Sequence, residues 1–92
     1  MNLKDLLINV ISTLNEDWEN EALAQINDET NVFIHIDSIS LLSIIIETES
    51  ALENELGRYV PLADEKLMDS QNSPFLSFKD WVNFVAEKIG SQ

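Results

Sequence analysis

The chain has 92 residues with 17 acidic and five basic side chains, a net charge of −12, and 45% of its residues are hydrophobic. This length suits one domain, residues 1–92, with a single small core. The negative charge is the wrong sign for binding nucleic acid or an anionic membrane surface. The absence of cysteine excludes disulfides and thiolate metal sites, and no apolar run approaches the ~20 residues of a membrane span. We therefore expect a monomeric, cytoplasmic protein with no membrane insertion.

The first expected element is a helix over residues 3–15. Asn2 can cap it, with Asp5 three residues later as the partner of a capping box. Apolar side chains then recur at the spacing of one helix face, at Leu3, Leu6, Leu7, Val10, Ile11 and Leu14.

Residues 15–36 show no sustained period and are expected to form a long loop. A short helical turn is expected near residues 19–25. The loop is too apolar to be disordered, so we expect its hydrophobic side chains to pin it to the core. These are Trp18, Leu23, Ile26, Val32, Phe33, Ile34 and Ile36.

The longest expected helix spans residues 38–56, with Asp37 as its N-cap and Gly57 just past its end. It contains acids and no base, so one side should be strongly negative. Glu49 interrupts the inward stripe and is expected to lie partly inward, while Thr48 sits at the margin of the stripe. The predicted inward residues are Leu42, Ile45, Leu52 and Leu56, flanked by Leu41 and Ile46.

The remaining elements are shorter. Val60-Pro61 is expected to be extended, followed by a short helix at residues 64–68 and a turn at 72–75. Ser77 can cap a last helix whose apolar face is Phe78, Trp81, Val82, Val85 and Ile89. The two tryptophans are expected to anchor the core with their indole N–H groups near the surface. The sequence thus predicts an all-α fold, a small four-helix bundle with three principal helices, one short helix and a long first loop.

One set of segments carries a family resemblance. The triplet Asp37-Ser38-Ile39 opens the long acidic helix, which continues through Ala51-Leu52-Glu53-Asn54-Glu55-Leu56 to Val60-Pro61. In this order the segments resemble the acyl carrier protein family, and the resemblance extends over nearly the whole chain. It implies a bundle of acyl-carrier type in which Ser38 bears covalent 4′-phosphopantetheine, whose thiol carries an acyl group as a thioester. Asp37 would help the phosphopantetheinyl transferase to dock and to orient its metal-bound cofactor.

The resemblance also implies partners. Acyl-loading and acyl-transferring enzymes of fatty-acid, lipid or secondary-metabolite synthesis would recognise the acidic helix through basic patches. The expected partner-binding residues are Ile39, Glu47, Glu53 and Glu55. The chain departs from the family pattern by about four added residues, one helical turn, between Ser38 and Val60-Pro61. It also has His35 where the family has glycine. These departures indicate a specialised branch and leave its cargo open.

Other functions compete with this one. An aminoacyl or peptidyl carrier would use the same serine, and an unmodified acidic adaptor would bind a basic partner through the long helix. Ser40 and Ser43 are alternatives to Ser38, because a serine can simply be tolerated on a helix. His35, Asp37 and Ser38 are the residue types of a hydrolase triad, but such close neighbours rarely reach one another, so no enzyme is expected. With one histidine and no cysteine, no metal site is expected either.

Overall fold

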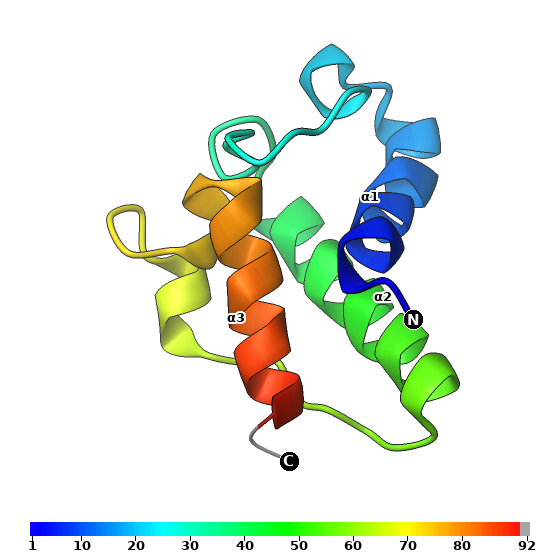
Figure 1. Ribbon diagram of the computed structural model, residues 1–92. Coiled ribbons are helices and arrows are strands. Elements are labelled where there is room, and N and C mark those ends of the chain that lie inside the picture. Colours follow the sequence, from blue (N-terminus) through cyan, green and yellow to red (C-terminus); the bar gives the residue numbers. More distant parts are fainter. Residues whose placement is uncertain (91–92) are drawn as a thin grey trace.

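The first helix is capped by a side chain at its start and ends at a residue with left-handed backbone. In the computed structural model, which describes residues 1–90, α1 spans Leu3–Trp18 (Figure 1). The Asn2 side chain accepts the Asp5 N–H at 3.1 Å, which is the predicted cap. Glu19 ends the helix with a φ of +53°, in the left-handed region. The placement of Trp18 in the loop is wrong, because it is the last residue of α1 and lies on the same face as Leu7 and Ile11.

The long first loop is fixed to the rest of the molecule by backbone bonds as well as by side chains. It contains a 3₁₀ turn, η1 (Glu21–Leu23), near the predicted position. The Phe75 carbonyl accepts the N–H groups of Val32 and Phe33 at 3.0 and 3.2 Å. Leu23 and Val32 are buried as expected, whereas Ile34 is 68% exposed and does not pin the loop.

The second helix, α2, spans Ser38–Leu56 and has the predicted limits. Asp37 caps its start, and Gly57 ends it with a φ of +71° and an N–H bond to the Glu53 carbonyl at 2.9 Å. Its predicted inward face is partly wrong. Leu42 is 48% exposed, and Ile46, which was expected to flank the face, is 61% exposed. The buried residues are Leu41, Ile44, Ile45, Thr48 and Leu52.

The C-terminal part contains two further 3₁₀ turns and a third helix. They are η2 (Glu65–Met68), η3 (Pro74–Leu76) and α3 (Phe78–Gly90). The predicted short helix is therefore a 3₁₀ turn, and part of the predicted turn at 72–75 is η3. The Ser77 hydroxyl caps α3 by accepting the Asp80 N–H at 3.1 Å, as expected. Phe84, which the predicted apolar face omitted, is also buried.

Trp81 occupies the centre of the aromatic part of the core. Its ring centroid lies 4.4 Å from that of Phe75 and 5.8 Å from that of Phe84. The expectation that its indole N–H lies near the surface is wrong, because the whole residue is buried. Trp18 is half-buried at the end of α1.

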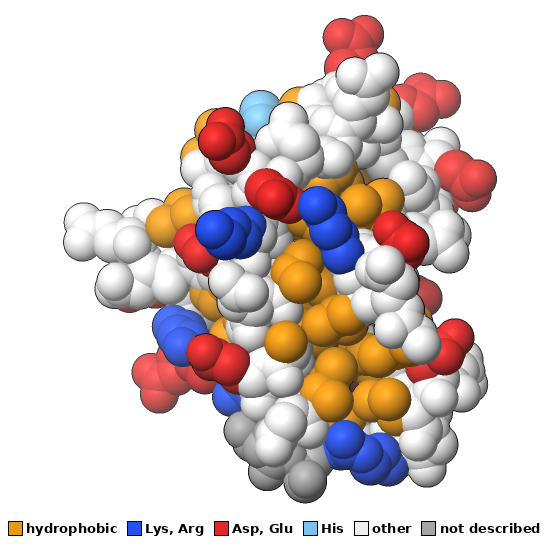
Figure 2. All heavy atoms as spheres, in the orientation of Figure 1, with side chains coloured by type: hydrophobic (Ala, Val, Ile, Leu, Met, Phe, Trp, Pro, Cys, Tyr) orange, Lys and Arg blue, Asp and Glu red, His pale blue; other side chains and the backbone are white. Residues whose placement is uncertain are grey.

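The helices pack around one core. In Figure 1, α1 and α3 lie in front of α2, and the segment containing η2 lies on the side of α3 away from α1. Figure 2 shows hydrophobic side chains along the seam between α3 and α1; half-buried Leu3, Val82 and Ile89 pack against the core from these two helices. No strand is present in residues 1–90, so the all-helical prediction is confirmed for the described chain. Within the same residues, no helix is both long and apolar enough to cross a bilayer.

Candidate functional site

Ser38 is the first residue of α2, and its side chain is exposed. No hydrogen bond joins its hydroxyl to another described residue, whereas the neighbouring serines are engaged. The Ser43 hydroxyl donates to the Ile39 carbonyl at 3.3 Å, and Ser40 is half-buried, with its backbone N–H bonded to the Asp37 carboxylate at 2.8 Å. Of these three serines, Ser38 therefore has the hydroxyl that an approaching enzyme could reach and modify.

Asp37 directs its carboxylate into the first turn of α2. One oxygen accepts the Ser40 N–H at 2.8 Å. This backbone bond, followed by a bond to the Ser40 side chain, lowers the pKa of Asp37 below its usual value. The N–H groups at a helix start can bind a phosphate, but here the carboxylate already uses the Ser40 N–H. A phosphate on Ser38 would therefore lie beside this cap and extend towards solvent.

An apolar stripe lies on the outward side of α2, beside Ser38. We call it the outer stripe, and it consists of Ile39, Leu42 and Ile46, at helical spacings of three and four residues. They are 75%, 48% and 61% exposed. Exposed hydrophobic side chains grouped on one face are typical of a binding surface, whereas single ones need no explanation. Of these three residues, the sequence analysis assigned only Ile39 to partner binding, and it placed Leu42 on the inward face with Ile46 flanking that face.

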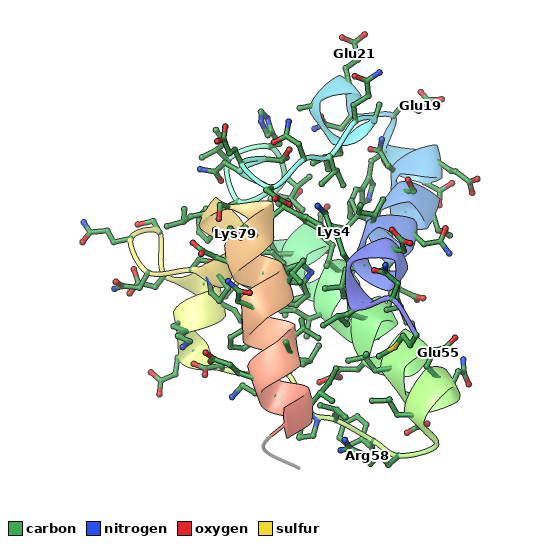
Figure 3. The ribbon with its side chains drawn as sticks, in the orientation of Figure 1. Lys4, Glu19, Glu21, Glu55, Arg58 and Lys79 are labelled. Atoms are coloured by element: carbon green, nitrogen blue, oxygen red, sulfur yellow. The ribbon has the colours of Figure 1, made fainter. Side chains whose placement is uncertain are left out.

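The acidic residues of α2 do not share one face. Glu53 follows Ile46 by seven residues, so it continues the side that carries the outer stripe. Glu47 instead lines a groove with Asn9 and Val10 of α1. Glu55 lines another part of the α1–α2 boundary, and Figure 3 shows it at the C-terminal end of α2, on the side of α1.

Glu49 and His35, which the sequence also singled out, each help to hold a loop next to α2. Glu49 is half-buried, as expected, and its carboxylate accepts the Leu62 N–H at 2.8 Å. It therefore fastens the segment after α2 to the helix. His35 is exposed in the loop before Asp37, and its backbone carbonyl accepts a bond from the Asn20 side chain at 2.9 Å. In the described residues, no group of three or more His, Cys, Asp or Glu side chains could hold a metal ion.

Comparisons of the chain with protein-family models, with curated proteins and with solved structures found no match. Its function is therefore inferred from the residues of the site.

Proposed function

We propose that the protein is an acyl carrier, of acyl-carrier-type fold, whose Ser38 hydroxyl bears 4′-phosphopantetheine. The observation that carries this proposal is that Ser38 is exposed at the start of α2 and has an unbonded hydroxyl, whereas Ser40 is half-buried and the Ser43 hydroxyl bonds to the Ile39 carbonyl. The family resemblance of Asp37-Ser38-Ile39 supplies the identity of the modifying group. The protein would act as a monomer in the cytoplasm and would deliver acyl groups to enzymes of fatty-acid, lipid or secondary-metabolite synthesis.

The residues around Ser38 fit such a group. The chain has no cysteine, so a thiol for a thioester has to come from an attached arm. In the modification, the Ser38 oxygen forms a bond to the β-phosphorus of coenzyme A, its proton passes to the transferase, and 3′,5′-ADP leaves. Asp37 precedes Ser38 in the chain and is exposed, and its pKa is lowered by its bonds to Ser40, which suits a role in docking the metal-bound cofactor of the transferase.

The outer stripe supports a carrier that is recognised by partner enzymes. Ile39, Leu42 and Ile46 offer an apolar contact beside the attachment point, and Glu53 adds charge on the same side. Partner surfaces with an apolar centre and a basic rim would complement this arrangement. No catalytic role is assigned to the protein's own residues.

One observation also favours a second function. The outer stripe would serve equally well as the binding face of an unmodified adaptor, since an apolar helix face can bind a partner groove without any prosthetic group. An aminoacyl or peptidyl carrier, in contrast, would share the Ser38 site and differ only in its cargo.

The test is modification by coenzyme A and a broad-specificity phosphopantetheinyl transferase, followed by intact-mass spectrometry. We expect one added phosphopantetheine on the wild-type protein, on Ser40→Ala and on Ser43→Ala, and none on Ser38→Ala. Circular dichroism should show that all four proteins are folded. A folded wild-type protein that gains no mass would favour the adaptor function. The mass found on protein from its native host would identify the cargo.

A further inference from the structure

A hydrophobic patch covers the seam between α1 and α3 on the face drawn in Figure 2. On α3 it consists of Val82, Ala86 and Ile89, whose spacings of four and three residues place them on one side of the helix. Leu3 contributes from the start of α1. Ala86 is exposed and the other three residues are half-buried, so the core reaches solvent on this side. We call these four residues the seam patch.

Basic side chains lie at both ends of the seam patch (Figure 2, Figure 3). At the start of α3, the backbone N–H of Lys79 donates to the Asp28 carbonyl at 2.9 Å. The Asp28 carboxylate pairs with Lys4 at 2.7 Å, so Lys4 and Lys79 are held at the same end. At the other end, the Arg58 guanidinium donates to the Ile89 carbonyl at 3.2 Å. Three of the five basic residues of the chain therefore border one patch.

Two of these positive charges are not neutralised within the described chain. The ion pairs among residues 1–90 use Lys4 and Lys88, so neither Lys79 nor Arg58 pairs with a carboxylate there. The bond of Arg58 to a backbone carbonyl uses one of its N–H groups, and a guanidinium has others. Lys79 and Arg58 are therefore both able to bind a carboxylate from another molecule.

The positions of these bases do not fit a role in reducing the protein's self-repulsion. That role would place them among the closely spaced acids of α2, but this helix contains no base. Basic residues beside an apolar patch instead match a binding surface, in which the hydrophobic centre supplies contact area and charged side chains at the rim select the partner. The seam patch thus favours a partner of negative charge, in contrast to the acidic α2.

The length of the seam patch indicates the shape of its partner. Lys79 and Ile89 are ten residues apart on α3, about 15 Å at the rise of an α-helix, and Arg58 bonds to Ile89. Two carboxylates eleven residues apart on a partner helix lie on the same side of it, about 16 Å from each other. Apolar side chains between them would meet the seam patch, since a third helix can pack along the surface formed by two others.

We propose that the seam patch binds an amphipathic helix of a partner protein, one whose apolar face carries an acidic residue at each end. The Lys79 ammonium pairs with one carboxylate and the Arg58 guanidinium with the other. Charges act over about 8 Å at physiological salt, so these two bases outweigh the more distant acids of α2.

This surface is separate from the outer stripe. The buried face of α2 is directed to the core, which α1 and α3 cover (Figure 1), whereas the outer stripe lies on the outward side of α2. A helix bound to the seam patch would therefore leave Ser38 accessible. The inference does not depend on the carrier function.

The probe is a synthetic helical peptide with two glutamates eleven positions apart and leucines between them on the same side. The control peptide has glutamine in place of both glutamates. Each is titrated into ¹⁵N-labelled protein, where backbone amide shifts report the site and the dissociation constant. We expect shifts at the seam patch and none at the outer stripe. The control peptide should bind about 2–10-fold more weakly, because exposed ion pairs contribute modestly, and Ser38→Ala should bind the acidic peptide as the wild type does.

Charge reversal tests the complementarity directly. Lys79→Glu and Arg58→Glu should each weaken binding of the acidic peptide. Lys66→Glu is the matched control and should weaken it less, because exposed Lys66 lies over the Phe84 ring on the other side of α3. A peptide with lysine in place of both glutamates should bind the double variant, with both reversals, better than it binds the wild type. Circular dichroism verifies folding, and Lys79→Glu, which leaves the backbone bonds in place, suffices if Arg58→Glu does not fold.

The proposal is overturned if the acidic peptide does not bind, if it binds no better than the glutamine peptide, or if the shifts lie on the outer stripe. It is also overturned if Lys66→Glu weakens binding as much as Lys79→Glu does. Concentration-dependent dimerisation of the protein alone, lost in Lys79→Glu and measured by analytical ultracentrifugation, would overturn it as well, because the seam patch would then bind a second copy of this chain.

Discussion

The Asp37 carboxylate stabilises the start of α2 in its ionised form. Its bonds to Ser40 lower its pKa in the folded protein below 3.8. A group with a lowered folded-state pKa contributes stability that is present above its unfolded-state pKa and is lost as the pH falls through the folded-state value. The Asp37 contribution should therefore be complete near neutral pH and disappear in acid.

This predicts how two substitutions at Asp37 respond to pH. Asp37→Ala should unfold at a lower temperature than the wild type at about pH 7, and the difference should shrink below about pH 3.8, as the wild-type carboxylate becomes protonated. Asp37→Asn keeps a neutral cap acceptor, so its melting temperature should fall less than that of Asp37→Ala. Thermal unfolding followed by circular dichroism over the pH series measures both. A deficit of Asp37→Ala that is equal at neutral and acidic pH would show that the ionised carboxylate contributes nothing.

At the residue scale, the sequence predicted the position of Ser38 at the start of α2 better than it predicted the faces of α2. The position of Ser38 follows from local capping by Asp37, which needs no knowledge of the tertiary fold. The inward face of α2, in contrast, depends on the tertiary fold, because aliphatic residues between positions 39 and 46 fall on several sides of the helix. A periodic pattern then cannot separate Ile44, which is buried, from Leu42 and Ile46, which are exposed.

At the scale of elements, the limits of α2 were predictable because both ends carry strong local signals. The starts of α1 and α3 were predictable in the same way, from the caps Asn2 and Ser77, whereas the end of α1 depended on contacts outside the helix. α1 continues to Trp18, since this side chain packs on the core and Asn15 exchanges two side-chain bonds with the backbone of Asn20, both at 3.0 Å. The 3₁₀ turn η3 depends on Ser73, whose hydroxyl joins Leu67 to Phe75. The first arrangement has no signature in the local sequence, whereas the second begins with Ser73-Pro74, a cap and a proline that form a local signal for the start of a helical turn.

The C-terminal end of α2 provides a prediction at the same scale. Gly57 has a φ of +71°, and a Cβ there would meet no atom within 4 Å. Gly57→Ala should thus be destabilising through backbone strain alone, by about 1–2 kcal/mol. Gly90→Ala is the control, because Gly90 has equal space and no positive φ, and its free energy of unfolding should be unchanged or slightly higher. Urea denaturation measures both values. Similar effects of the two substitutions would rule out strain at Gly57 as the cause.

For the molecule as a whole, negative charge is the dominant electrostatic feature. Lys4 pairs with Asp28 at 2.7 Å and Lys88 with Asp64 at 3.5 Å. Even if each of the five bases neutralised one of the 17 acids, 12 acids would remain. Figure 2 shows carboxylates spread around the edges of the visible face. Their mutual repulsion opposes the compact state.

The protein should therefore become more stable as salt is added. Screening that contributes about 1 kcal/mol would raise the melting temperature of a chain of this size by about 4–8 °C. Thermal unfolding in a sodium chloride series measures the effect. A variant with exposed Glu16 and Glu55 replaced by Gln should start at a higher melting temperature and respond less to salt. If the melting temperature of the wild type does not change with salt, the acids are too far apart to repel one another appreciably.

The same charge should guide partners to α2, and the acidic residues of α2 differ in the side of the helix on which they lie. A basic partner surface attracts these acidic side chains over about 8 Å at physiological salt. Such attraction raises the association rate more than the final affinity. Glu53 lies on the side of the outer stripe, whereas Glu55 lies at the boundary with α1. The Glu53 and Glu55 side chains are both exposed. Replacing either one by Lys changes the net charge by the same amount, so the two substitutions differ only in position.

Glu53→Lys should therefore slow the pantetheinylation of Ser38 several-fold at low salt, and Glu55→Lys should slow it less. Both effects should shrink as ionic strength rises, since screening removes the attraction that each reversal disturbs. Initial rates measured at substrate concentrations well below saturation, over a salt series, report the association step. Equal slowing by the two substitutions would mean that only the net charge steers the transferase. If neither substitution slows the reaction at low salt, the outer stripe of α2 is not the face on which the transferase docks, and Ser38 must be approached from the loop that precedes it.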